Sequence, residues 1–322
     1  MRIKKKLLGL IGIILFIFIL SRLDLKEVSS IIKSINPFWF SVIVIMRILY
    51  IVIKSYAWQY IMKIMKIKYS LWNCFFMYSV GQFAAQITPA RVGDLVRVIY
   101  LKNDGHNLIR SFATVVIDRA SDITFMLLAS YISMYVFIDY FLKEVIWINT
   151  LIIISTVVFT FLLFNKRLVR KLIYAFLSYF IPQKYKEQIK AHFLDLINEI
   201  KNIRLGKLLV FFILIIISWM FYFFHMYVLA IILNIQISFL YVIVCISITS
   251  IIISLPISVS GLGTRDISLI FLFSLIGISK ELAISYSLLY LFLNTIPALI
   301  GMLFWIKKPI KDINIFKINQ NQ

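Results

Sequence analysis

Cysteine and histidine are scarce in this chain of 322 residues, which has two cysteines and three histidines. Both cysteines, Cys74 and Cys245, lie inside apolar runs, and no Cys-x-x-Cys or zinc-ligand spacing occurs. The histidines are too scattered to form a ligand cluster. The sequence therefore predicts no metal and no cofactor. It also shows no Ser/His/Asp arrangement and no glycine-rich phosphate loop, so we assign no catalytic residues.

Charge is scarce too, and most of it has one sign. Only 15% of the residues are charged and 62% are hydrophobic, with 34 Lys and Arg against 14 Asp and Glu. Soluble domains are nearer half apolar and a quarter charged. The mean hydropathy of +0.95 indicates a membrane protein. The basic excess then follows from the positive-inside rule and from anionic lipid headgroups, which excludes a nucleic-acid-binding domain.

Six apolar runs are long enough to be predicted as transmembrane spans. The first follows a basic N-terminus and resembles a signal peptide, but no cleavage site of small residues follows, so we interpret it as an uncleaved span. The runs are Leu7–Leu20, Phe38–Met62, Ser111–Ile138, Val145–Phe164, Leu208–Leu233 and Leu282–Ile306.

Two further apolar segments, residues 71–101 and 238–278, are interrupted half-way by proline and glycine. Backbone breaks at membrane depth are tolerated only where protein or water surrounds the freed polar groups. We therefore predict two re-entrant or broken-helix hairpins; the alternative is that each is a pair of ordinary spans joined by a short loop. The residues that break the backbone are Pro89 and Gly93 in the first segment and Pro256, Gly261 and Gly263 in the second.

The distribution of Lys and Arg predicts the orientation. With the N-terminus in the cytoplasm, 23 of them fall in cytoplasmic segments and 5 in external loops. We thus expect a multi-pass protein of the plasma membrane with both termini in the cytoplasm. An added cysteine at Lys143 should react with an impermeant reagent from outside, and one at Lys184 should not.

This layout predicts an all-α polytopic fold with an internal inverted repeat. Each half has two spans, a hairpin and one span, and the segment Thr88–Asp94 corresponds to Leu255–Asp266. We expect a first repeat at residues 1–140, a second at 141–306, and a short basic tail at 307–322. The basic stretch 165–207 is either an amphipathic connector on anionic lipid or a plain linker. Inverted repeats with broken helices are typical of secondary transporters.

Ionisable residues inside the apolar segments cost several kcal/mol each on insertion scales (roughly 2.5–3.5) and therefore indicate a site. Eight of them carry no net charge together, which favours a paired network in a wet cavity. Arginine binds phosphate in a bidentate manner, and helix N-termini at the glycine breaks would offer free N–H donors, so we predict an anionic headgroup site. The alternative is that these pairs only hold helices together. The eight are Arg91, Asp94, Arg97, Asp118, Arg119, Asp122, Arg265 and Asp266.

Three other polar residues inside the spans are interpreted as structural. Arg47 and Lys54 are seven residues apart on one face of the second span, and we expect them to snorkel toward the interface. His225 in the fifth span is expected to pack against neighbouring helices.

Three motifs resemble a known family. Residues 81–97 (Gly-Gln-Phe-Ala-Ala-Gln-Ile-Thr-Pro-Ala-Arg-Val-Gly-Asp-Leu-Val-Arg) resemble the Pro-x-Arg-x-Gly-Glu-x-x-Arg signature of the lysylphosphatidylglycerol synthase transmembrane, or flippase-like, family. Residues 113–122 are similar to its Thr-Val-x-x-Glu-Arg-x-x-Asp motif, and residues 255–266 to its Leu-Pro…Gly-x-Gly-x-x-Glu motif. The chain departs from the family at Asp94, Asp118 and Asp266, where glutamate is usual.

The resemblance implies a lipid translocase that moves an anionic or aminoacylated phospholipid, or a lipid-linked sugar, between leaflets. It gives no support for the family's aminoacyl-transferase activity here, because we expect no transferase domain in this chain. The alternatives are a membrane-embedded component of lipid modification and a small-solute secondary transporter. The expected partners are membrane lipids, with a homodimer and a separate lipid-modifying enzyme as further partners that the resemblance allows.

Overall fold

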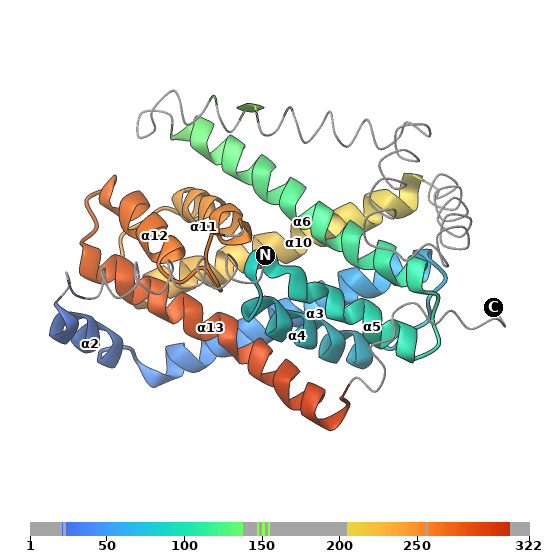
Figure 1. Cartoon of the computed structure of the whole chain (residues 1–322). Helices are drawn as coiled ribbons and strands as arrows, with labels where there is room; N and C mark the ends of the chain where they lie inside the picture. The colour runs from blue at the N-terminus through green and yellow to red at the C-terminus, as the bar shows by residue number, and fades with distance from the viewer. Residues whose placement is uncertain are drawn as a thin grey trace.

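The computed structural model describes residues 24–137, 205–255 and 257–309, together with Ser21, Trp147, Thr150, Leu151 and Ile154. In this part of the chain all regular structure is helical, as predicted, and no strand occurs (Figure 1). The helices are α2 (Leu25–Lys33), α3 (Pro37–Ile64), α4 (Leu71–Gln86), the 3₁₀ helix η1 (Pro89–Leu95), α5 (Val96–Asn103), α6 (Leu108–Val136), α10 (Leu205–Ile232), α11 (Phe239–Ser254), α12 (Thr264–Ser274) and α13 (Lys280–Lys307).

Three helices are long and apolar enough to cross a membrane, namely α3, α13 and residues 206–232 of α10. At 1.5 Å per residue, the 28 residues of α3 extend for about 42 Å, more than the hydrocarbon thickness. Its start is set by Pro37 at the first helical position and by Asn36, whose side chain accepts a hydrogen bond from the Phe38 N–H. Helix α6 has 29 residues but carries three ionisable residues near its middle.

These four long helices match four of the six predicted runs. The runs Leu7–Leu20 and Val145–Phe164 lie outside the described residues, apart from a few isolated positions in the second. The same holds for nearly all of the connector 165–207 and of the tail 307–322.

Both interrupted segments form a helix, a break and a shorter helix. In the first, α4 is followed by η1 and then by α5, which has 8 residues. In the second, α11 is followed by an irregular stretch and then by α12, which has 11 residues. The predicted breaks at Pro89, Gly93, Gly261 and Gly263 all fall between the helices of a pair, and Pro256 lies outside the described residues.

Three helices of the later part of the chain follow three earlier helices at one interval. The helix α10 ends 168 residues after α3 (232 against 64), and α11 begins and ends 168 residues after α4 (239 against 71, 254 against 86). Helix α12 begins 168 residues after α5 (264 against 96). At this interval Arg265 matches Arg97, since each is the second residue of its helix.

The helix packing joins the two parts of the described chain. The helix α13 packs along α4, α11 packs along α6, and α3 lies against α10 (Figure 1). Two glycines allow the closest approaches. A Cβ atom at Gly301 of α13 would lie 2.1 Å from the Ser79 carbonyl oxygen of α4, and one at Gly93 of η1 would lie 2.1 Å from the Ala84 oxygen. Any larger residue would force these backbones apart.

A polar corner ties the end of α13 to the loops beside α3 and α5. The Lys308 ammonium lies 2.8 Å from the Asp104 carboxylate, and the Tyr69 hydroxyl donates a hydrogen bond to the same carboxylate. Burial raises the pKa of the Tyr69 hydroxyl well above its usual value, and the hydrogen bond to Asp104 adds to this. The tyrosine therefore stays protonated and keeps its role as donor across the physiological pH range.

Candidate headgroup site

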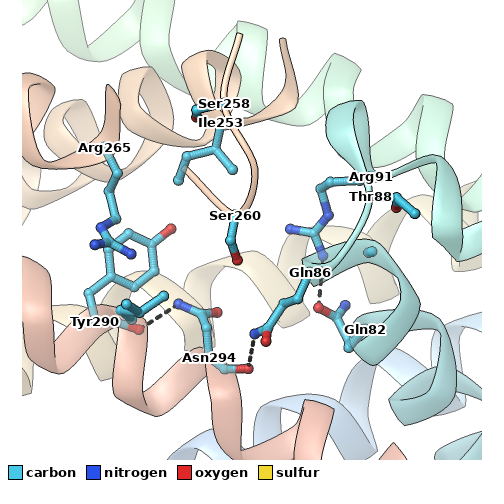
Figure 2. Close-up of a pocket in the computed structure, with 12 residues that line it drawn as sticks. Gln82, Gln86, Thr88, Arg91, Ile253, Ser258, Ser260, Arg265, Tyr290 and Asn294 are labelled. Atoms are coloured by element: carbon cyan, nitrogen blue, oxygen red, sulfur yellow. Dashed lines mark hydrogen bonds between the residues drawn. The ribbon is translucent and has the colours of Figure 1, made fainter. Parts of the chain in front are cut away.

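A pocket with about 520 Å³ of empty space, part of it open to the surroundings, lies between the two broken segments (Figure 2). Its wall is formed by α4, η1, the stretch before α12, the start of α12 and the middle of α13. Most of the lining side chains are polar, which is unusual for the interior of so apolar a protein. The polar lining residues are Gln82, Gln86, Thr88, Arg91, Ser258, Ser260, Arg265, Tyr290 and Asn294.

Arg91 brings a partly exposed guanidinium to one side of this pocket. Its Nη2 donates a hydrogen bond to the Gln82 Oε1 at 2.7 Å, and its Nε lies 3.8 Å from the Asp94 carboxylate. The side chain keeps 35% of its surface exposed, so the charge is available to a ligand.

The backbone is strained where it borders the pocket, in both breaks. Arg91 has φ 55° and Ser260 has φ 59°, values in the left-handed region that residues other than glycine rarely adopt. Strain of this kind costs about 1–3 kcal/mol and concentrates at functional sites. Both residues line the pocket, one from each break.

Arg265 reaches the pocket from the other side, and its orientation is fixed by its neighbours. Its Nη2 lies 2.6 Å from the Asp266 carboxylate, its Nε donates to the Ser287 hydroxyl at 2.7 Å, and its guanidinium carbon lies 5.8 Å from the Tyr290 ring centroid. The Asp266 carboxylate accepts a hydrogen bond from the Gly263 N–H and so also caps α12. One carboxylate thus sets the start of the helix and the direction of the arginine.

The expectation of free backbone donors at the glycine breaks is wrong at two positions. The Gly93 N–H donates to the Thr88 hydroxyl at 2.8 Å, and the Gly263 N–H donates to Asp266 at 2.8 Å. Each polar side chain is close in sequence to its glycine, so the break satisfies its own backbone. An anion in this pocket would therefore rely on side-chain donors.

A second group of the predicted residues forms a buried ion network away from the pocket. The Lys54 ammonium lies 3.2 Å from Asp118 and 2.5 Å from Asp122, and Arg97 lies 3.1 Å from the other Asp118 oxygen. The Trp219 indole N–H donates to Asp122 at 2.9 Å. These contacts join α3, α5, α6 and α10.

Lys54 therefore does not snorkel, contrary to our expectation. Its side chain is fully buried, because two carboxylates of α6 compensate its charge in place. The spacing of Arg47 and Lys54 on one helix face carried no information about carboxylates on a different helix.

Arg119 and Asp94 connect the network to the pocket. The Arg119 Nε lies 3.2 Å from Asp94, and its Nη1 lies 3.6 Å from Asp122. Asp94 is in turn the carboxylate nearest to Arg91 among the described ion pairs. Asp94 thus lies between the pocket arginine Arg91 and the network arginine Arg119.

Arg47 does not snorkel either. It is buried in the first half of α3 and donates a hydrogen bond from Nη2 to the Asn294 Oδ1 at 2.6 Å. His225 is buried beside the Tyr222 ring, in agreement with the packing role that we expected.

Of the eight ionisable residues predicted for the site, Arg91 and Arg265 line the pocket and the other six lie behind it. Sequence reasoning missed the amide side chains Gln82, Gln86 and Asn294, and the ring of Tyr290. The signal for the amides was present, since each stands in an otherwise apolar segment. Within the described residues, no group of three His, Cys, Asp or Glu side chains is placed to hold a metal ion.

Comparison with known proteins agrees with the motifs. The family model described as "Lysylphosphatidylglycerol synthase TM region" matches residues 7–301. A UPF0104 membrane protein of Methanocaldococcus jannaschii is 27% identical over 303 residues, which cover 89% of each chain. The family-model match includes α3, α6 and α10, both broken segments and residues 280–301 of α13. The chain is thus a membrane protein of the lysylphosphatidylglycerol synthase transmembrane-region family.

Proposed function

We propose that this protein is a lipid translocase that moves an anionic lipid headgroup between leaflets through the pocket between its two breaks. The observation that carries the proposal is the pair Arg91 and Arg265. One arginine comes from each broken segment, and both line the same polar pocket. A guanidinium presents a planar set of donors that matches phosphate geometry. Lining amides and hydroxyls supply further hydrogen bonds to the headgroup.

The charge balance of the described interior supports an anionic substrate. Six basic side chains belong to the pocket, the network and their surroundings, namely Arg47, Lys54, Arg91, Arg97, Arg119 and Arg265. Four carboxylates accompany them: Asp94, Asp118, Asp122 and Asp266. Two positive charges are therefore uncompensated, which favours a negatively charged ligand.

The proposed architecture is an inverted repeat with two re-entrant hairpins. The α5 and α12 helices extend for about 12 and 16 Å, much less than the hydrocarbon thickness of about 30 Å. The packing of the helices supports the repeat. In the first half, α4 packs on α13 of the second half, and its counterpart in the second half, α11, packs on α6 of the first half. Inverted repeats give alternating access when one part rocks against the other around a midplane site.

The orientation in the plasma membrane is tested by cysteine labelling. The native cysteines are buried, so background reaction should be low. A cysteine at the exposed Lys68 should react only after the cytoplasmic side is opened, and one at Lys280 should react in intact cells. Reaction of position 68 from outside would invert the proposed topology.

Transport is tested in proteoliposomes of neutral lipid that contain fluorescent phosphatidylglycerol, with an impermeant quencher added outside. Unmodified protein should move the labelled lipid from the inner to the outer leaflet, where the quencher reaches it. Both Arg91→Lys and Arg265→Lys should slow this movement about tenfold, because the loss of one charged hydrogen bond costs about 1.5 kcal/mol. Arg110→Lys, outside the pocket, is the control.

Chemical analysis of the lipid after the same assay separates movement from modification. The proposal predicts that the lipid keeps its structure. Equal rates for unmodified protein and both pocket variants, normalised to folded protein, would refute headgroup recognition by these arginines.

A further inference from the structure

Arg47 is the buried cation in the described structure whose charge no carboxylate compensates. It is 2% exposed, and Nε and Nη1 are buried with no hydrogen-bond partner among the described residues. Its polar contact is to a neutral amide, Asn294. The predicted apolar runs outside the described residues, 7–20 and 145–164, contain no Asp or Glu that could serve.

Arg97 provides a matched comparison. Each guanidinium lies over two aromatic rings: Arg97 at 4.7 and 4.8 Å from Trp58 and Tyr78, and Arg47 at 5.0 and 5.3 Å from Tyr50 and Tyr222. Both side chains are fully buried. They differ in their partner, because Arg97 has the Asp118 carboxylate at 3.1 Å and Arg47 has only an amide. The surroundings of Arg47 thus resemble those of Arg97 in their rings and burial, with a neutral amide in place of the carboxylate.

The position of Arg47 connects it to the pocket. Asn294 lines the same pocket as Arg91 and Arg265 (Figure 2). Its Oδ1 accepts a hydrogen bond from the Arg47 Nη2. Arg47 is ten residues from the start of α3, which is about 15 Å along a 42 Å helix and therefore well inside the span. Asn294 therefore contacts both the pocket and Arg47.

We infer that Arg47 forms an inner anion subsite, which receives the phosphate group of the substrate after it has entered the pocket beside Arg91 and Arg265. The phosphate oxygens accept hydrogen bonds from Nε and Nη1 and compensate the buried charge, and Asn294 turns aside. The inference rests on the proposed function for the route of the phosphate, but the subsite itself is testable without transport.

The test measures thermal stability of purified protein in neutral detergent, with two probes that separate the sources of phosphate: inorganic phosphate and dihexanoyl-phosphatidylglycerol. Dihexanoyl-phosphatidylcholine is the zwitterionic control. Without probe, Arg47→Gln should melt at a higher temperature than the unmodified protein, because an uncompensated buried charge has been removed. The affinity for the effective probe, from its effect on melting, should fall at least tenfold in this variant.

Two variants serve as controls. Arg97→Gln should melt at a lower temperature, because Asp118 loses a partner, and should keep the probe affinity. Arg47→Lys retains the charge with fewer donors and should keep a weakened response. Stabilisation by phosphatidylglycerol but not by inorganic phosphate identifies a lipid headgroup, and the reverse identifies free phosphate.

The inference is wrong if Arg47→Gln is less stable than the unmodified protein or fails to fold, or if neither probe has an Arg47-dependent effect. A protein that shows the Arg47-dependent response but moves no lipid in vesicles would retain the subsite and refute the proposed function. Loss of transport in Arg91→Lys with an unchanged Arg47-dependent response would support both.

Discussion

The two broken segments begin alike and differ in where their arginine finds its partner. Arg97 and Arg265 occupy the same place, each the second residue of the helix that follows the break. Arg97 pairs with Asp118 on α6, a different helix, at 3.1 Å. Arg265 pairs with its own neighbour Asp266 at 2.6 Å and lines the pocket.

This difference indicates that the ion pairs of the two segments have different roles. In the first segment the ion pairs connect α5 to α3, α6 and α10, so that several helices depend on them. In the second segment the pair is local, and its effect is to orient one guanidinium. We therefore expect changes in the first network to affect folding and changes around Arg265 to affect function with the fold retained.

The largest expected effect is that of Lys54→Met. The variant leaves Asp118 and Asp122 without the ammonium that lies between them, and loss of one partner of a buried pair costs about 3–5 kcal/mol. The yield of monodisperse protein and its melting temperature should both fall sharply. Lys68→Met, at an exposed position, should change neither. Normal stability of the Lys54 variant would remove the basis for calling the network structural.

Gly93→Ala should have the next largest effect. The new methyl would lie 2.1 Å from the Ala84 carbonyl oxygen, which belongs to the backbone and has no rotamer to change. Overpacking of this kind costs about 1–3 kcal/mol or more and should open the first hairpin. The matched change Gly206→Ala meets open space and should be tolerated. Comparison of the two melting temperatures checks this, and equal values would contradict the close approach.

Ser287→Ala sharpens the comparison at the second segment. The hydroxyl accepts from the Arg265 Nε at 2.7 Å and donates to Asp266 at 2.6 Å, so its loss removes one of the contacts that orient the arginine. One such hydrogen bond contributes about 1 kcal/mol, which corresponds to a roughly fivefold slower transport. The variant should be recovered in normal yield. A loss of folded protein without a loss of specific transport would show that the contacts around Arg265 serve folding and not function.

Asp266→Glu should have the smallest effect. Glutamate at the third position of a helix also accepts from the N-cap N–H, so the bond from Gly263 can be retained. The stability should change by about 1 kcal/mol or less, with transport near the unmodified rate. Asp266→Asn is the contrasting variant, since it keeps the size but removes the charge beside Arg265. Equal losses in both would show that shape matters here more than charge.

The sequence alone determined the class of fold and the positions of the breaks. Long apolar runs require helices, because every backbone polar group in lipid must be satisfied within its own segment. Proline and glycine act locally, and the breaks at Pro89–Gly93 and Gly261–Gly263 therefore lie where we predicted them. The cost of burying a charge can also be recognised from the sequence, because a charged residue stands out in an apolar run. Arg91 and Arg265 could therefore be predicted as site residues.

Only the tertiary structure decided which charges are partners and which remain free. Lys54 and Arg47 share one face of α3, but the first meets two carboxylates of α6 and the second meets an amide of α13. The shared position of Arg97 and Arg265, each the second residue of its helix, likewise became visible only from the helix boundaries. An ion pair forms between residues brought together by packing, 64 and 68 positions apart for Lys54 and its carboxylates. Helical periodicity describes one helix face and contains no information about what packs against it.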